Sequence, residues 1–129
     1  MAYKLVETAL AQADLDAILS YLALSLENPA AATAFANEVE KCYAALEQLP
    51  YLYEQCRDPR LSSKGYRKAV IKHYLLIYRV DESQKTVYLL RFFYGRQNYE
   101  TLLLHKTSHS NEREVLLRTV IITRTNTVS

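Results

Sequence analysis

The first half of the chain repeats its apolar residues with the period of an α-helix. A short strand is predicted at residues 3–6, and from Thr8 to about Leu26 apolar side chains recur every three or four positions, as on the buried face of a helix that Thr8 can cap. Asn28 followed by Pro29 predicts the start of a second helix, which Pro50 ends. Each helix is roughly 30 Å long, and the short connection predicts an antiparallel hairpin. Its core-facing residues are predicted to be Ala11, Leu15, Ile18, Leu19, Leu22 and Leu26, then Ala32, Phe35, Val39, Cys42, Tyr43, Leu46 and Leu49.

The second half has the pattern of β-strands. Strands are predicted at residues 66–71, 73–80 and 86–94, and the polar turn at residues 81–84 joins the last two as a hairpin. Residues 51–64 are predicted to be an irregular linker. Both faces of the strand at 73–80 are largely apolar, so one face packs on the helices and the other forms an aromatic and basic groove or is covered by a partner. The predicted fold is α+β, with an N-terminal strand and an antiparallel two-helix hairpin packed on a small, mainly antiparallel sheet.

Charge divides the chain near residue 56. Residues 1–56 carry two basic and eight acidic side chains, whereas residues 57–106 carry eleven basic and four acidic ones. Such asymmetry is a hint of an anionic or acidic partner. Lysine and arginine also solvate the exposed edges of sheets, so charge alone leaves both interpretations open.

Composition excludes several classes of protein. A chain of 129 residues fits one domain, and its apolar runs are far shorter than the ~20 residues that span a bilayer. The N-terminus lacks the apolar core of a signal peptide. Cys42 and Cys56 have neither metal-ligand spacing nor the density of a disulfide framework, so a reduced cytoplasmic protein without a metal is expected. The two glycines, Gly65 and Gly95, cannot form a glycine-rich phosphate loop, and no cofactor is expected.

Three stretches resemble a known family. The first helix carries A-x-x-D-L-x-x-I-x-x-Y from Ala11 to Tyr21, and the hairpin ends at Leu49-Pro50. The sheet carries R-x6-Y-x3-Y from Arg67 to Tyr78, then V-x-L-L-x-x-x-Y-G-R at residues 87–96. In order and spacing over residues 3–103, the chain resembles the RelE/ParE toxin superfamily of bacterial type II toxin–antitoxin modules, also called plasmid stabilisation proteins. The resemblance implies a toxin domain at residues 1–105.

The tail at residues 106–129 has no match to the family pattern. It would be a disordered end, an added strand, or a segment that folds back over the basic groove in the manner of an antitoxin.

The family resemblance implies a growth-inhibiting toxin that a cognate antitoxin neutralises. RelE-like members cut mRNA in the ribosomal A site, whereas ParE-like members inhibit DNA gyrase and lack the nuclease residues. Metal-independent RNA cleavage needs a base, an acid and cations for the phosphorane charge. If the protein is a nuclease, and so an enzyme, the candidate catalytic residues are Arg67, His73, Arg91, Tyr94 and Arg96.

Two departures from the nuclease pattern favour the ParE-like alternative. Leu75 stands where RelE-like nucleases have an arginine, and Phe93 stands where one nuclease branch has a histidine. The long helical hairpin also resembles ParE. We therefore expect an inhibitor of DNA gyrase, with a ribosome-dependent mRNA endonuclease as the alternative. Structural roles for His73 and Arg96 stay open, and the residues expected to bind a partner are Lys64, Arg67, Lys68, Lys72, Arg91 and Arg96.

Overall fold

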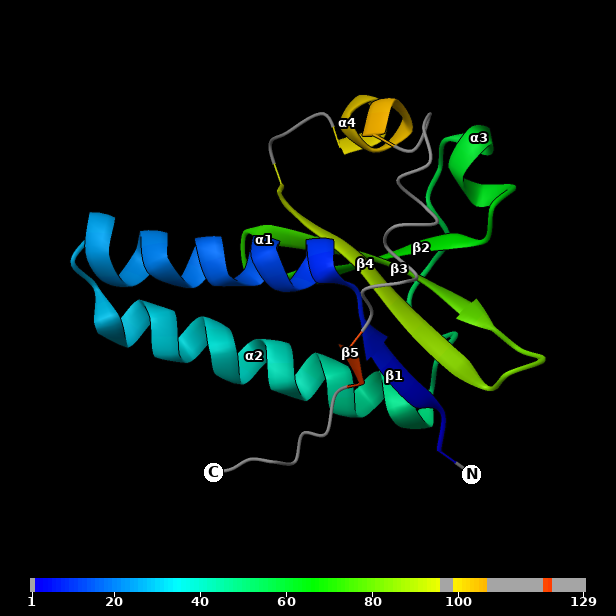
Figure 1. The fold of residues 1–129 in the computed structure, drawn as a ribbon, viewed down its shortest axis with the longest axis horizontal. Coiled ribbons are helices and arrows are strands. Elements are labelled where there is room, and N and C mark those ends of the chain that lie inside the picture. The colour runs from blue at the N-terminus through cyan, green and yellow to red at the C-terminus, as the bar shows by residue number, and fades with distance from the viewer. Residues whose placement is uncertain (1, 96–98, 107–119, 122–129) are drawn as a thin grey trace.

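A helical hairpin covers one face of a twisted sheet in the computed structural model, which describes residues 2–95, 99–106 and 120–121 (Figure 1). The predicted α+β fold is confirmed. The elements are β1 (Lys4–Glu7), α1 (Ala9–Ser20), the π-helical turn η1 (Tyr21–Ser25), α2 (Pro29–Gln48), α3 (Pro59–Ser62), β2 (Tyr66–Ile71), β3 (Tyr74–Asp81), β4 (Thr86–Tyr94), α4 (Tyr99–Lys106) and β5 (Val120–Ile121).

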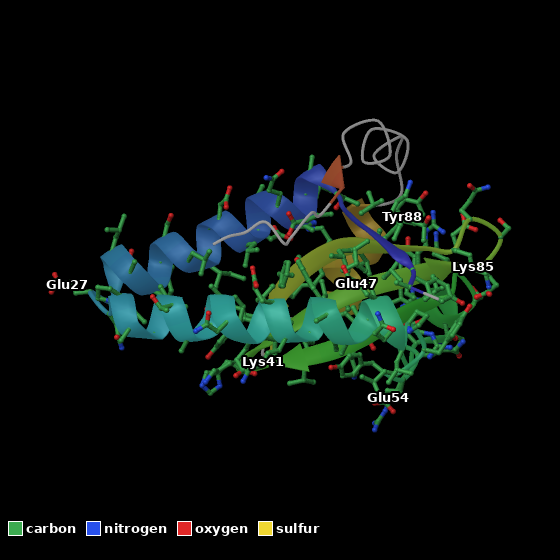
Figure 2. All side chains as sticks on the ribbon, turned by 90° about the horizontal axis from the view of Figure 1, so that it is seen from below. Glu27, Lys41, Glu47, Glu54, Lys85 and Tyr88 are labelled. Carbon is green, nitrogen blue, oxygen red and sulfur yellow. The ribbon has the colours of Figure 1, made fainter. Side chains whose placement is uncertain are left out.

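Both helices of the hairpin begin at the predicted caps. The Thr8 hydroxyl accepts the N–H of Ala11 at 3.1 Å, and the Asn28 side-chain oxygen accepts the N–H of Ala31 at 3.1 Å. The regular part of the first helix ends at Ser20, earlier than expected, and η1 continues it. Glu27 then reverses the chain with a φ of 50°, in the left-handed region where glycine is usual. Figure 2 shows Glu27 at the free end of the hairpin.

The described residues form a sheet with the strand order β2-β3-β4-β1-β5. β1 runs parallel to β4, and the other neighbours are antiparallel. In β5, Val120 and Ile121 pair with Glu7 and Val6 of β1. These two residues of the tail therefore form an added strand. The other tail residues, except Lys106 at the end of α4, lie outside the described part of the chain.

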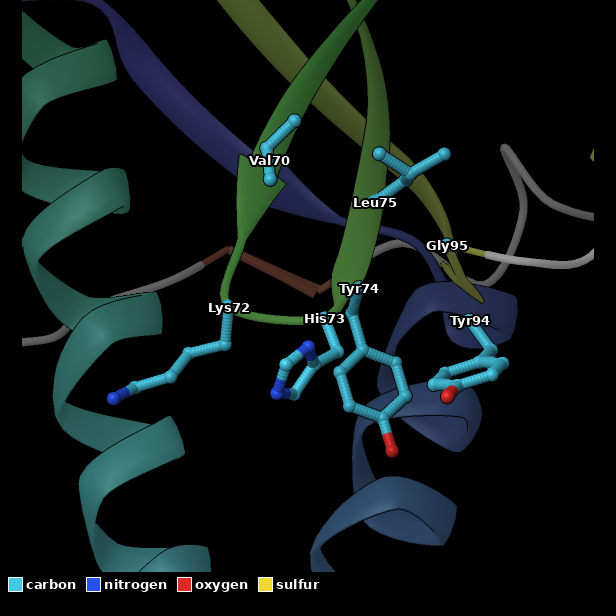
Figure 3. Close-up of a pocket in the computed structure, with 7 residues that line it drawn as sticks. All are labelled: Val70, Lys72, His73, Tyr74, Leu75, Tyr94 and Gly95. Carbon is cyan, nitrogen blue, oxygen red and sulfur yellow. The ribbon is translucent and has the colours of Figure 1, made fainter.

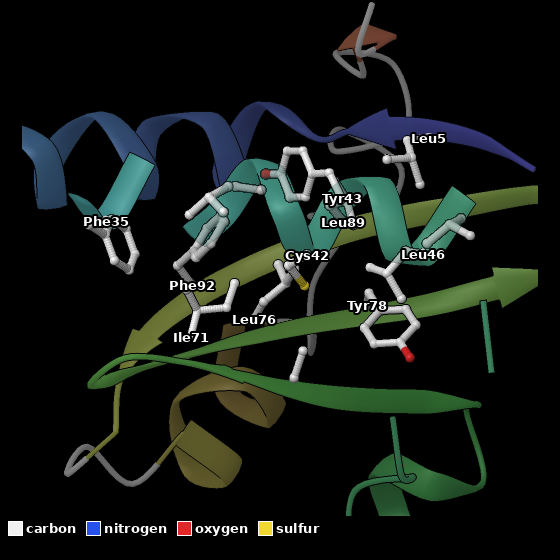
Figure 4. Packing of buried hydrophobic residues seen from close by; sticks show 14 residues of the cluster. Leu5, Phe35, Cys42, Tyr43, Leu46, Ile71, Leu76, Tyr78, Leu89 and Phe92 are labelled. Carbon is white, nitrogen blue, oxygen red and sulfur yellow. The ribbon is translucent and has the colours of Figure 1, made fainter. Parts of the chain in front are cut away.

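The main core lies between the hairpin and the sheet (Figure 4). Leu26 and Leu49, however, are 52% and 58% exposed, so their prediction as core residues is wrong. The i→i+5 bonds of η1 change the helical period just before Leu26, and Leu49 has left the helical conformation as the C-cap of α2. The buried cluster includes Phe35, Val39, Cys42, Tyr43, Leu46, Leu76, Tyr78, Leu89 and Phe92.

The opposite face of the sheet is covered by the chain itself. The region predicted as an irregular linker contains α3, which begins where Asp58 accepts the N–H of Arg60 at 2.8 Å. α4 was not predicted at all. Together the two short helices bury much of the face that was expected to be an open groove or to await a partner. The second buried cluster is Cys56, Leu61, Tyr66, Leu75, Ile77, Phe93, Tyr99 and Leu103.

The strand predicted to begin at His73 begins instead at Tyr74. Ile71 pairs with Tyr74, so Lys72 and His73 form a two-residue hairpin turn. Lys72 has a φ of 57°, and a positive φ at the first central residue is a feature of the type II′ turn. His73 is therefore exposed at a tip of the sheet rather than on a strand.

Candidate functional site

Two pockets flank the end of the sheet at the β2–β3 turn. A pocket of about 450 Å³ separates the hairpin from the turn, and a pocket of about 330 Å³ lies beside β2. His73, Tyr74 and Tyr94 line both pockets, with Lys72 at the second (Figure 3). We call these four residues the turn site. The larger pocket is completed by Tyr21, Leu22 and Leu26, and the smaller one by Val70, Leu75 and Gly95.

Aromatic packing positions the turn site. The ring of Tyr74 lies 5.0 Å from that of Phe35 and 5.5 Å from that of Tyr94, between centroids. Burial raises the pKa of the Tyr74 phenol, so its hydroxyl stays protonated at neutral pH and can donate a hydrogen bond. The N–H of Gly95 donates to the carbonyl of His73 at 2.8 Å. A Cβ at Gly95 would lie 3.0 Å from that carbonyl oxygen, so the close approach of β4 to the turn favours glycine at this position.

Two predicted arginines are engaged within the fold. Arg67 donates from Nη1 to the carbonyl of Tyr53 at 2.7 Å, and its guanidinium carbon lies 4.9 Å from the ring centroid of Tyr51. Arg91 donates from Nε to Asp14 Oδ2 at 2.6 Å and from Nη2 to Asp14 Oδ1 at 3.1 Å. Both arginines therefore hold segments of the chain together.

These arginines also lie at a distance from the turn site. Arg67 pairs with Tyr78, which lies four residues along β3 from Tyr74, or about 13 Å at the rise of a strand. Arg91 pairs with Ile77, about 10 Å from Tyr74 along the same strand. The candidate residues that the fold brings together are His73, Tyr94 and Lys72.

The remaining candidates are placed separately. Lys64 is exposed beyond α3, and Lys68 is partly buried with its Nζ 5.7 Å from the ring centroid of Tyr99. On the same sheet the guanidinium of Arg79 lies 4.5 Å from the ring centroid of Tyr88. Arg96 lies outside the described residues.

Sequence analysis did not predict that residues of the helical hairpin line the larger pocket. Tyr21, Leu22 and Leu26 follow the apolar stripe of the first helix and were assigned to the core or to the family motif. The turn η1 begins at Tyr21, and π-helical turns are frequent at functional sites. Helical periodicity alone gives no sign of such a turn, so no signal in the sequence could have placed these residues at a pocket.

Neither a metal centre nor a membrane span is found in the described part of the chain. No group of three His, Cys, Asp or Glu side chains could hold a metal ion among the residues placed by the structure. The helices within those residues are too short or too polar to cross a bilayer.

Comparison with known proteins identifies the family. Solved structures similar to this chain include a chromosomal ParDE toxin–antitoxin system from P. aeruginosa, with a TM-score of 0.57 and 23% identity over 72% of this chain and 96% of that one. They also include the RelBE2 toxin–antitoxin complex from Mycobacterium tuberculosis, with a TM-score of 0.53 and 24% identity over 73% of this chain and 99% of that one. Both show a shared fold. A comparison with curated proteins gave no significant match. The family model described as ParE toxin of type II toxin–antitoxin system, parDE, matches residues 6–99. The predicted resemblance is confirmed, and the chain belongs to the ParE toxin family of type II toxin–antitoxin systems.

Proposed function

We propose that the protein is a cytoplasmic toxin that stops growth by binding DNA gyrase and that a cognate antitoxin neutralises it. The observation that carries this proposal is the placement of Arg67 and Arg91. A metal-independent nuclease needs cations beside the phosphorane, and these two side chains are held by Tyr53 and Asp14 instead. The proposed mode of action is therefore protein binding rather than RNA cleavage.

The exposed cations that remain suit a binding role. Lys64 and Lys72 are exposed, and Lys72 adjoins a pocket lined by aromatic and aliphatic side chains. Interfaces commonly combine buried aromatic anchors with a charged rim that steers association. The turn site offers both parts of such a surface.

A supercoiling assay tests the target. Purified toxin should inhibit supercoiling of relaxed plasmid by gyrase, and Lys72→Glu should weaken the inhibition because it reverses a charge at the turn site. Lys4→Glu is the matched control, since Lys4 is exposed on β1 and the charge change is the same. Normal supercoiling in the presence of saturating wild-type toxin would contradict the proposal.

A second function is favoured by one specific observation. His73, Tyr94 and Lys72 share a pocket of about 330 Å³, which places an imidazole, a phenol and an ammonium group around one space. An imidazole titrates near neutral pH and can move the proton of a ribose hydroxyl. Ribosome-dependent cleavage of mRNA in a translation extract, lost in His73→Gln, would support this alternative, and intact mRNA with the wild-type protein would exclude it.

A further inference from the structure

The π-helical turn η1 builds one wall of the larger pocket. The N–H of Leu26 donates to the carbonyl of Tyr21 at 2.9 Å, which is the i→i+5 bond of such a turn. Residues five positions apart are separated by about 140° around a regular α-helix, whereas an i→i+5 bond brings them to nearly the same side. The turn therefore sets Tyr21 and Leu26 together in the lining of the larger pocket, where a regular helix would hold them apart.

A second uncommon conformation lies at the smaller pocket. Lys72 has a φ of 57°, which is costly for a residue other than glycine, and backbone strain of this kind is concentrated at functional sites. Within the described residues the Lys72 ammonium makes no ion pair and lies over no aromatic ring. Glu38, which lines a third pocket together with Lys72, pairs with Lys41 at 3.4 Å. An exposed ammonium group is therefore available at the smaller pocket.

Three tyrosines from three elements meet at the larger pocket. Tyr21 comes from η1, whereas Tyr74 and Tyr94 pair across β3 and β4. Burial and, after it, the neighbouring phenols of Tyr21 and Tyr94 raise the pKa of Tyr74, as expected where three phenols share one space. Figure 3 shows Tyr74 and Tyr94 pointing the same way from the ends of their strands. Since Tyr21 and Tyr94 are 49% and 42% exposed, part of each ring remains open to a planar ligand.

Charge and size select the kind of ligand. Among the residues that the structure places, no acidic side chain lines either pocket. Aromatic rings can hold a cation, but Lys72 would repel it and would attract an anion. The two pockets, of about 450 and 330 Å³, lie within the range of roughly 300–1,000 Å³ that is usual for small-molecule sites. The ligand should therefore combine a planar ring with an anionic group.

A free nucleotide combines these features. Its base stacks on aromatic side chains whatever the base, and tyrosine hydroxyls both donate and accept hydrogen bonds, as the edges of a base require. Its terminal phosphate carries nearly two negative charges at neutral pH and forms charge-assisted hydrogen bonds with an ammonium group. His73, Tyr74 and Tyr94 line both pockets, so one ligand can reach the rings of the larger pocket and the lysine of the smaller one.

We propose that the turn site and Tyr21 together bind a free nucleotide, with its base against the tyrosines of the larger pocket and its phosphate at Lys72. The assignment goes beyond the proposed function and does not depend on the cellular target, because all the groups that it uses belong to this chain. It also requires no cleavage of RNA.

Titration of the full-length, ¹⁵N-labelled protein with AMP tests the assignment through amide chemical shifts. The shifts should be concentrated at Tyr21, at the β2–β3 turn and at the end of β4, and should be absent from the β3–β4 turn around Glu82, at the other end of β3. Adenosine, which lacks the phosphate, should bind about tenfold more weakly, or about 1.4 kcal/mol. Inorganic phosphate, which lacks the base, should also bind more weakly than AMP.

Three outcomes of these titrations would overturn the assignment. The first is the absence of shifts at about 10 mM AMP, where even a site of millimolar affinity would be filled. The second is an affinity for inorganic phosphate equal to that for AMP. The third is tighter binding of the trinucleotide ApApA than of AMP, which would make the ligand an RNA strand rather than a free nucleotide.

Two variants separate the roles of the ring and the charge. Tyr21→Ala should bind both AMP and adenosine about tenfold more weakly, because it removes a stacking surface. Its matched control is Tyr51→Ala, since Tyr51 is 48% exposed and lies beside Glu82, away from both pockets. Lys72→Ala should bind AMP about tenfold more weakly and adenosine unchanged, whereas Lys4→Ala should alter neither. A folded Tyr21→Ala or Lys72→Ala protein that binds AMP like the wild type would overturn the assignment.

Discussion

The ion pair between Asp14 and Arg91 should contribute strongly to stability, and Asp14→Ala tests this. The pair joins α1 to β4 across 77 positions of sequence. Asp14 Oδ2 accepts Arg91 Nε at 2.6 Å and the backbone N–H of Phe92 at 2.9 Å, while Oδ1 accepts Arg91 Nη2 at 3.1 Å. One carboxylate therefore satisfies three donors.

The expected magnitude follows from the burial of the pair. The side chains of Arg91 and Asp14 are only 14% and 18% exposed, so water screens the interaction less than at the surface. Removing one partner of a fully buried pair costs about 3–5 kcal/mol, because the other charge is left without compensation. Allowing for the residual exposure, Asp14→Ala should cost about 3 kcal/mol and lower the Tm by roughly 12 °C in a chain of this size. Asp14→Asn keeps one acceptor for Phe92 and should cost about half as much.

Urea unfolding followed by circular dichroism measures these losses. The matched control is Glu38→Ala, which breaks the pair with Lys41 at 3.4 Å, where the two side chains are 41% and 75% exposed. That exposed pair should contribute less than about 0.5 kcal/mol.

A loss below about 1 kcal/mol for Asp14→Ala would refute the reasoning, because it would place the pair in the range of surface ion pairs. The same measurement bears on Arg91 as a nuclease candidate. A purely catalytic arginine could be replaced without loss of stability, whereas Arg91→Ala is expected to lower the Tm.

Three further predictions concern single side chains. Glu27→Gly should stabilise the protein by about 1 kcal/mol in urea unfolding, because Glu27 has a φ of 50° and glycine adopts that conformation without strain; an unchanged midpoint would contradict this. Side-chain hydrogen bonds to Glu82, of which the one from Lys85 has the largest effect, lower the pKa of Glu82 from 4.5 to about 2. The ionised Glu82 carboxylate therefore stabilises the fold above about pH 4.5, and this stabilisation is lost as the pH falls toward 2. Glu82→Gln should flatten the stability–pH curve in that window, and parallel curves for the two proteins would refute the assignment. Burial raises the pKa of the Cys42 thiol to about 11 and also raises that of Cys56; iodoacetamide at pH 8 should modify neither thiol in the native protein and both in urea, as read by intact mass, and rapid native labelling would contradict their burial.

Local rules were sufficient for much of the fold. Thr8 and Asn28 are recognisable as caps from the residues that follow them, and both cap the predicted helices. The strand at 66–71 matches β2, and that at 86–94 matches β4. Such features depend on residues a few positions apart, so the sequence carries them directly.

Features that depend on distant contacts could not be predicted. Nothing near Arg91 in the sequence indicates that Asp14 will bind the Arg91 side chain. Arg91 was therefore predicted to bind a partner, because its role in holding α1 to β4 could not be seen. The exposure of Leu26 depends on a π-helical turn that leaves no periodic signal. The predicted start of the strand at His73 was wrong by one residue. The turn formed by Lys72 and His73 contains neither glycine nor asparagine, the usual turn residues, so nothing in the sequence indicated it.

The stacking of cations on aromatic rings changes the meaning of the basic composition. The charged groups of Arg67, Lys68, Arg79 and Arg91 each lie over a tyrosine or phenylalanine ring of the same chain. A protein that binds a nucleic acid releases counterions from the phosphates when its lysines and arginines contact them, and this release makes the affinity fall as the salt concentration rises. Since these four cations are held by their rings, the basic half of the chain offers fewer phosphate contacts than its net charge suggests. The alternation of basic and aromatic residues in this sequence thus reflects packing within the sheet. Raising the salt concentration should weaken the binding of a partner less than the number of basic residues implies.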